Sequence, residues 1–191
     1  MKDPFLMKDP LLKGHPLHAI LTDLPIGMHV AGNACDFIGL ITRRAGFRFA
    51  ARTAYTGALI SGTVTGLVGL WDYQAVPQDN PARRIGALHA WLNGGVVGLM
   101  LTSMAVRNLA PEPADGRPQP LAVGLSTAGL AVLGVSAWLG GDLVYRMGWR
   151  VNKAEEAEQL EDTLRKRGQT DLVNQAQQTV QQYEQERAIL P

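Results

Sequence analysis

Three of the four histidines lie in one short stretch, KGHPLHAILTDLPIGMH, which spans residues 13–29 and opens a long apolar segment. Imidazole nitrogens bind metal ions and haem iron, and they exchange protons near neutral pH. An ionisable side chain inside a membrane costs about 3 kcal/mol or more unless it is paired or bound. These histidines therefore mark a candidate site.

A polar stripe continues from this stretch along one helical face. Its members are His15, His18, Thr22, His29, Asn33 and Asp36. Their spacings of 3, 4, 7, 4 and 3 residues keep them on one side of a helix that turns about 100° per residue. We expect the stripe to face the interior of a helical bundle.

The fourth histidine, His89, opens a later apolar segment, and Asn93 follows it by about one helical turn. First and third spans run in the same direction, so His18 and His89 are expected at the same depth. The second and fourth spans run the other way and end at that same face. Their last residues there are Asp72 and Tyr73, and Asp142 and Tyr145.

Two imidazoles at one depth on parallel helices can supply both axial ligands of one haem. We therefore predict that His18 and His89 bind a b-type haem, with Asp72 or Asp142 orienting the ligand rings through their second nitrogen. Asn93 and Tyr145 complete the polar layer. Glycines at 62, 66, 69, 140 and 141 make room for a neighbouring backbone or a flat ligand. Such a site would transfer electrons to a redox partner protein or a quinol, without catalysis.

Three alternatives use the same residues. An iron, copper or zinc ion without haem could bind His15, His18 and His89 together with one of the aspartates. Protons or a solute could pass along the stripe, which covers about 27 Å of helix from His18 to Asp36. The network could also do no more than lock the helices to one another.

Four apolar segments, at residues 17–42, 54–73, 85–106 and 121–147, each have about the length that a membrane-spanning helix needs. We expect an all-α integral membrane protein: a polar segment at 1–16, a four-helix bundle at 17–151 and a helical tail outside the membrane at 152–191. We expect no repeat architecture. The near repeat of MKDPFL and MKDPLL makes Met7 a second candidate start.

Several function classes are not expected. A net charge of +1 argues against a nucleic-acid partner. Cys35 is the only cysteine, which excludes an intramolecular disulfide and a cysteine-based metal site. The sequence has no nucleophile elbow, P-loop or dinucleotide fingerprint, so we do not expect an enzyme.

The motifs GHPLHAILTDLPIG, GLWDY, ALHAWLN and GGDLVYRMGWRV, in this order, resemble the predicted membrane proteins called domain of unknown function 2231. The resemblance covers about residues 13–151 and implies four spans. Family members read His-Pro-x-His-Pro where this chain has Ala19, and relatives often have a further histidine where it has Met147. Some relatives join the domain to a Rieske-type iron–sulfur domain, which implies redox surroundings, but the tail has no such cysteine and histidine pattern.

The arginines at 43, 44, 48 and 52 predict that the first connection is cytoplasmic. Both termini would then lie on the outer face of the cytoplasmic membrane, and the first span would target the protein because no cleavable signal is visible.

In the tail we expect two helices separated at Gly168. An apolar seam of Val173, Ala176, Val180 and Tyr183 favours a protein partner or self-association. Packing of this seam on the membrane domain is the alternative. The tail has five basic and eight acidic residues, so we do not expect it to bind anionic lipid.

Overall fold

The computed structural model describes residues 11–12, 15–111, 113–149 and 152–189, with side chains described at 16–111, 113–149 and 158–182. The chain forms two units, Met1–Met147 and Gly148–Pro191, which are treated separately below. This division lies near the expected boundary after residue 151, which stays a prediction.

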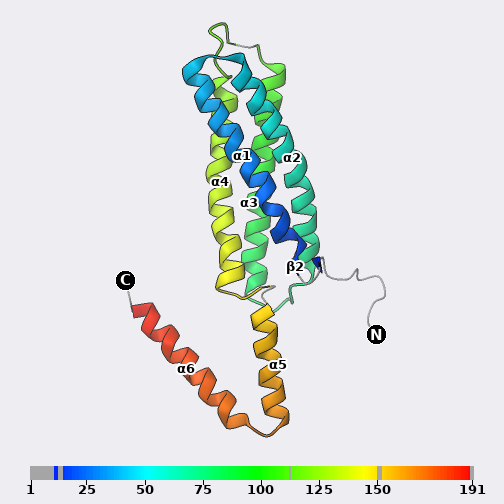
Figure 1. Ribbon diagram of the computed structural model, residues 1–191, viewed down its shortest axis with the longest axis vertical. Helices are drawn as coiled ribbons and strands as arrows, with labels where there is room; N and C mark the ends of the chain where they lie inside the picture. The colour runs from blue at the N-terminus through cyan, green and yellow to red at the C-terminus, as the bar shows by residue number, and fades with distance from the viewer. Residues whose placement is uncertain (1–10, 13–14, 112, 150–151, 190–191) are drawn as a thin grey trace, which may run out of the picture. The chain divides into compact units, whose positions relative to one another are not determined.

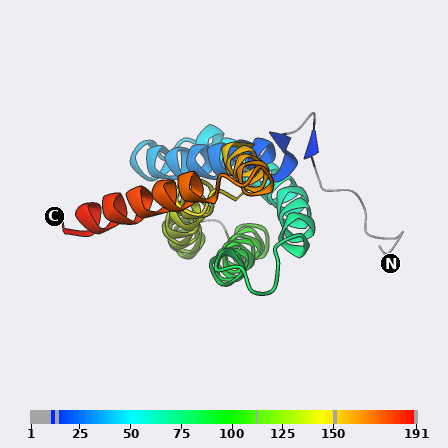
Figure 2. The same ribbon diagram turned by 90° about the horizontal axis from the view of Figure 1, so that it is seen from below.

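The first unit holds four long helices (Figure 1). They are α1 (Leu17–Thr42), α2 (Ala45–Gln74), α3 (Ala82–Leu109) and α4 (Pro120–Tyr145). A two-residue strand pair, β1 (Leu11–Leu12) and β2 (His15–Pro16), precedes α1. Helix α1 packs mostly on α2, and α3 mostly on α4. The bundle is thus a pair of antiparallel hairpins, which Figure 2 shows end-on.

The helix boundaries follow from local chemistry. Helix α1 ends at Arg43, whose left-handed φ of 56° and N–H bond of 2.9 Å to Gly39 O close the last turn. Pro25 lies inside α1 and has no N–H to donate to Leu21 O. Thr65 Oγ1 on α2 donates to that carbonyl instead, at 3.3 Å, so the proline leaves no buried carbonyl unpaired there.

Three predicted boundaries need correction. Helix α2 begins at Ala45 rather than at residue 54, so Arg48 and Arg52 belong to the helix and not to a loop. Helix α3 continues to Leu109 and therefore includes Arg107. Helix α4 ends at Tyr145 rather than at residue 147.

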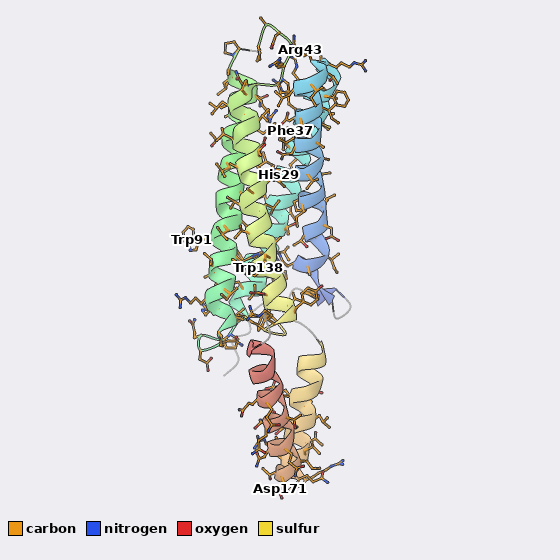
Figure 3. All side chains as sticks on the ribbon, turned by 90° about the vertical axis from the view of Figure 1, so that its left-hand side faces the viewer. His29, Phe37, Arg43, Trp91, Trp138 and Asp171 are labelled. Carbon is orange, nitrogen blue, oxygen red and sulfur yellow. The ribbon has the colours of Figure 1, made fainter. Side chains whose placement is uncertain are left out.

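The bundle has an apolar exterior and a polar interior. Phe37, Trp91 and Trp138 project from its surface (Figure 3), and Trp91 is 80% exposed. The buried polar side chains are His29, Asn33, Asp36, Thr65, Asp72, Ser103, Arg107, Ser126 and Ser136. This distribution suits a lipid environment and confirms a helical membrane bundle.

Within the described residues, α1, α3 and α4 are long and apolar enough to cross a membrane. Helix α2 has the length, but glycines, threonines and two arginines lower its hydropathy. The fourth span therefore stays a prediction.

The second unit is a helical pair, α5 (Asn152–Lys166) and α6 (Thr170–Ile189), separated at Gly168 with a φ of 75°. Val173 is buried, and Gln177 Nε2 donates to Glu161 Oε1 at 2.5 Å. Of the other seam residues, Ala176 and Val180 are exposed, and the side chain of Tyr183 lies outside the described ones. A partner for the seam stays a prediction.

Candidate functional site

The polar interior forms two layers near opposite ends of the bundle. The histidine layer consists of His18, Thr65, His89, Asn93 and Ser136. The ion-pair layer consists of His29, Asp36, Tyr55, Arg107 and Ser126. An apolar cluster of Ala51, Tyr55, Ala58, Val96 and Met100 overlaps the ion-pair layer at Tyr55. The predicted stripe on α1 does face the interior at His29, Asn33 and Asp36.

Each imidazole in the histidine layer is fixed by a backbone carbonyl of the adjacent helix. His18 Nδ1 lies 3.0 Å from Thr65 O, and His89 Nδ1 lies 2.8 Å from Ser136 O. A carbonyl only accepts hydrogen bonds, so each Nδ1 carries a proton, and a neutral ring in this tautomer has its lone pair on Nε2. The two rings face one another, with centroids 6.1 Å apart and planes at 88°.

Asn93 lies beside His89, one turn later on α3. Its Nδ2, which has two hydrogens to donate, lies within hydrogen-bonding distance of three acceptors: His89 Nε2 at 3.1 Å, His89 O at 2.9 Å and Ser136 Oγ at 2.8 Å. The structure thus brings together three of the predicted site residues, His18, His89 and Asn93.

The aspartates and the tyrosine of the predicted site are arranged differently. Asp142 pairs with Arg146 at 3.3 Å, and Tyr145 is 89% exposed. Asp72 is buried, but the Nδ1 atoms that it was expected to orient bond to carbonyls. In this geometry the helix backbone supplies an acceptor for each Nδ1, and the orienting role of the aspartates stays a prediction.

The residues of the alternative metal site lie partly inside and partly outside the described side chains. The described residues contain no group of three or more His, Cys, Asp or Glu side chains placed to hold an ion. His15 lies before α1, in β2, and its side chain is outside the described ones. Its part in a metal site stays a prediction.

Two of the predicted space-making glycines accommodate the imidazole rings. A Cβ on Gly69 would lie 2.7 Å from His18 Cε1, and one on Gly140 would lie 3.1 Å from His89 Cε1. Each glycine comes four residues after the residue whose carbonyl binds the ring. Helix α2 reads Thr65-x-x-x-Gly69 and helix α4 reads Ser136-x-x-x-Gly140. Both hairpins therefore combine a carbonyl that binds the imidazole with a glycine that makes room for it.

These correspondences extend along both hairpins with one constant offset. His18 and Thr65 are 47 residues apart, and so are His89 and Ser136. The second set follows the first by 71 residues, which is also the separation of Asp36 and Arg107. Further buried pairs at this offset are Ala51 and Ala122, Tyr55 and Ser126, and Ala58 and Gly129. The offset relates the two hairpins position by position and does not involve the near repeat at the amino end.

The ion-pair layer joins the two hairpins through a buried salt bridge. Arg107 Nη1 and Nη2 donate to Asp36 Oδ1 and Oδ2 at 2.8 and 2.5 Å, and Asp36 is fully buried. The Tyr55 hydroxyl donates to Asp36 Oδ2 at 2.8 Å, and the Arg107 guanidinium lies 4.8 Å above the Tyr55 ring. The sequence analysis missed Arg107 and Tyr55. The 71-residue offset from Asp36 was the signal that could have found Arg107.

Residues 14–153 match the family model described as predicted membrane protein, DUF2231. The chain belongs to this family. No curated protein and no solved structure matches it. The DUF2231 match covers both hairpins and therefore both polar layers, although the family's description states no activity.

Among the described residues of this DUF2231 protein, one buried side-chain nitrogen, His29 Nδ1, has no hydrogen-bond partner. His29 Nε2 donates to Ser126 O at 2.9 Å, which leaves Nδ1 as an acceptor. Among the described residues, this Nδ1 is buried without a hydrogen bond. The ring packs against Tyr55, with centroids 5.7 Å apart. The geometry here holds a neutral imidazole, with one lone pair available to a water molecule or a proton.

The histidine layer holds two imidazoles whose Nδ1 atoms bond carbonyls, while His89 Nε2 lies 3.1 Å from Asn93 Nδ2. Two imidazoles bound through Nε2 to opposite sides of one metal, at about 2 Å each, would have ring centroids roughly 6 Å apart. The observed separation of 6.1 Å is close to that distance. Metal-binding histidines usually donate their other ring N–H to a carboxylate, a backbone carbonyl or water.

Proposed function

We propose that this DUF2231 chain is a four-span membrane protein that binds one b-type haem between its hairpins and transfers electrons. His18 and His89 would be the axial ligands. The observation that carries the proposal is the pair of carbonyl-anchored imidazoles at a centroid separation of 6.1 Å.

The packing of the hairpins supports this assignment. Each imidazole is anchored within its own hairpin, His18 to α2 and His89 to α4. The two rings meet at the interface between the hairpins, where helix packing is less extensive than within each hairpin. A flat ring entering this interface would find both imidazoles held through Nδ1 before it binds, which favours affinity.

Ligation requires Asn93 to release His89 Nε2. Its Nδ2 has two other acceptors in place, His89 O and Ser136 Oγ, so the amide keeps hydrogen bonds when the iron replaces it. The loss of one weak contact is small beside an iron–nitrogen bond.

Four spans are proposed because α2 also has an apolar outer face. Ile60, Val64 and Leu67 are exposed along it, as expected of a helix in contact with lipid. The arginines at the α1–α2 end of the bundle favour a cytoplasmic location of that end under the positive-inside rule. The histidine layer then lies near the outer face of the cell membrane, where a redox protein or quinol would meet it.

A second candidate is a structural lock without a cofactor. It is favoured by the fit of the imidazole rings against Gly69 and Gly140 and by the bond from Asn93 to His89. In this case the histidines would only join the hairpins.

An oxidised-minus-reduced absorbance spectrum of the purified protein, with elemental analysis, tests the proposal. We expect a Soret shift that both His18→Ala and His89→Ala abolish. Thr22→Ala is the matched control, because Thr22 lies one turn after His18 and its hydroxyl bonds only Ala19 O among the described residues. A colourless protein that needs both histidines only for stability would establish the lock, and stoichiometric zinc or copper would favour the metal site.

A further inference from the structure

The two imidazoles of the histidine layer have equivalent anchors but different neighbours at Nε2. His18 and His89 occupy corresponding positions of the two hairpins, 71 residues apart. We propose that Asn93 makes them unequal as ligands: it holds His89 Nε2 whenever the iron does not, so that His89 is the displaceable ligand and His18 the permanent one. The proposal rests on the haem site proposed above and concerns the control of that same site.

The repeated sequence shows where the two hairpins differ. The segments LHAIL and LHAWL, which begin at residues 17 and 88, agree in four of five positions. The next residue is Thr22 in the first hairpin and Asn93 in the second. The Thr22 hydroxyl bonds its own helix, because Oγ1 donates to Ala19 O at 2.7 Å. Within the described part of the chain, His18 Nε2 has no hydrogen-bond partner, whereas Nδ1 bonds a carbonyl.

Asn93 places an amide where Thr22 has only a short hydroxyl. Its Nδ2 lies 3.1 Å from His89 Nε2, which accepts a hydrogen bond when the ring proton is on Nδ1. The other two acceptors of Nδ2 are His89 O and Ser136 Oγ. An amide nitrogen has two hydrogens, so Nδ2 still has a partner for each when Nε2 binds another group. The contact to Nε2 is therefore a weak and reversible competitor for this ligand.

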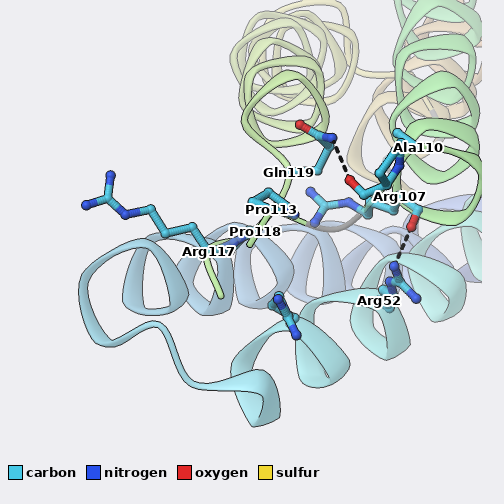
Figure 4. Close-up of a pocket in the computed structure, with 9 residues that line it drawn as sticks. Arg52, Arg107, Ala110, Pro113, Arg117, Pro118 and Gln119 are labelled. Carbon is cyan, nitrogen blue, oxygen red and sulfur yellow. Dashed lines mark hydrogen bonds between the residues drawn. The ribbon is translucent and has the colours of Figure 1, made fainter. Parts of the chain in front are cut away.

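Helix α3 is held at its other end, so the exchange at His89 must be local. The Arg107 side chain binds Asp36, and the Arg107 carbonyl accepts a hydrogen bond from Arg52. Figure 4 shows the second of these contacts. A shift of the whole helix would break both, whereas a change of partner at Nε2 requires only side-chain movement.

The expected exchange transfers no electron and no proton. In the reduced protein, the bond between the iron and His89 Nε2 breaks, and Nε2 accepts a hydrogen bond from Asn93 Nδ2 again. An added carbon monoxide forms a bond to the iron through its carbon at the vacated position. Carbon monoxide is a suitable probe, because its binding to ferrous haem reports an open coordination position.

The first test needs no haem. The full chain is purified without cofactor, with isotope-labelled histidine, and the chemical shifts of the imidazole nitrogens are measured. Hydrogen bonding shifts the signal of an unprotonated ring nitrogen. We therefore expect His89 Nε2 to differ from His18 Nε2, and Asn93→Thr to remove the difference. Equal shifts in the unmodified chain would overturn the proposal, whether or not the chain binds haem.

The second test titrates carbon monoxide into the reduced, haem-loaded full chain and follows the Soret band. Asn93→Thr gives the second hairpin the residue of the first and removes the competitor. We expect the half-saturating concentration of carbon monoxide to rise about fivefold, the factor that corresponds to one hydrogen bond of ordinary strength. An unchanged or lower concentration would overturn the proposal.

Two further variants locate the effect. Asn33→Thr is the matched control, because Asn33 also lies one turn after a histidine and donates to its carbonyl, His29 O, at 3.2 Å. An equal effect of Asn33→Thr would contradict a specific role of Asn93. Thr22→Asn places the amide beside His18 at a position that is not buried, and it leaves Asn93 unchanged. It should lower the half-saturating concentration, because both ligands then have a competitor, and no change would overturn the competition.

The outcomes separate the two proposals. A chain that retains no haem contradicts the proposed function, and the inference about the haem site with it. A chain that retains low-spin haem, but takes up no carbon monoxide or binds it equally in all variants, contradicts the role of Asn93 alone.

Discussion

At the scale of single residues, two side-chain pairs join the hairpins, and the members of each pair are 71 residues apart. The two pairs differ in their chemistry. His18 and His89 present like side chains to one another, whereas Asp36 and Arg107 present opposite charges. Like side chains facing across an interface suit a shared ligand between them. Opposite charges satisfy each other, so the Asp36–Arg107 pair needs no ligand between its members.

Asp36→Asn should destabilise the bundle by about 3–5 kcal/mol, because it leaves the Arg107 charge buried without its partner. Thermal or denaturant unfolding in detergent measures the loss. The exchanged double variant, Asp36→Arg with Arg107→Asp, should recover part of the stability, since the two positions correspond in the two hairpins. A double variant as unstable as the sum of its single changes would argue against that equivalence.

Gly69→Ala should displace the His18 ring, because the added Cβ would lie 2.7 Å from Cε1 and Nδ1. We expect a loss of about 1–3 kcal/mol and a perturbed haem spectrum. Gly66→Ala, on the same helix, meets no atom within 4 Å and is the control. Identical behaviour of the two variants would mean that Gly69 does not set the position of the ring.

Part of the site could be predicted from residue spacing. The matched depth of His18 and His89 follows from two parallel helices, and Asn93 follows from one turn of α3. The roles of Asp72 and Asp142 could not be predicted from spacing, because they depend on which acceptor forms the hydrogen bond with each Nδ1. Here the carbonyls of Thr65 and Ser136 do.

At the scale of elements, the hairpin is the repeated unit. Helices α1 and α2 are joined through Arg43 and Arg44, whereas α3 and α4 are joined by the longer proline-containing connection. The last residues of the two hairpins, Gln74 and Tyr145, are nevertheless 71 residues apart. The buried polar groups also lie at corresponding positions.

Splitting the chain between Gln78 and Asp79, in the α2–α3 connection, should give two fragments that associate when they are coexpressed. Each hairpin satisfies its own backbone hydrogen bonds, and the interface is formed by side chains. Affinity purification of one tagged fragment measures recovery of the other. Arg107→Leu in the second fragment should reduce recovery, and a complete failure of the unmodified fragments to associate would contradict the two-hairpin description.

The elements were more predictable than their ends. Helix α1 begins and ends at the residues that its apolar run predicts, because Pro16 and Arg43 bound it. Helix α2 could not be bounded from hydropathy, since Arg48 and Arg52 are helical residues outside the apolar run. Arg107 was assigned to a loop for the same reason, although burial and Asp36 hold it inside the bundle.

At the scale of the whole molecule, the buried polar groups lie inside the membrane unit and its outer face is apolar. The span count determines which connections share one face of the membrane. Helix α2 decides that count, because it is less apolar than its neighbours. With Cys35 replaced by alanine, single cysteines at positions 44, 79 and 115 test it by labelling in intact cells. Four spans predict that 44 and 115 share one face and that 79 is labelled from the other. Labelling of 44 and 79 from the same face would mean that α2 does not cross.

Electron paramagnetic resonance of the oxidised, haem-loaded protein tests the central claim most directly. Two imidazole ligands with ring planes near 88° predict a low-spin ferric signal of strong anisotropy. His18→Ala and His89→Ala should each convert it to a high-spin signal. A high-spin signal from the unmodified protein, or a chain that retains no haem when haem is supplied, would contradict the assignment of His18 and His89 as axial ligands.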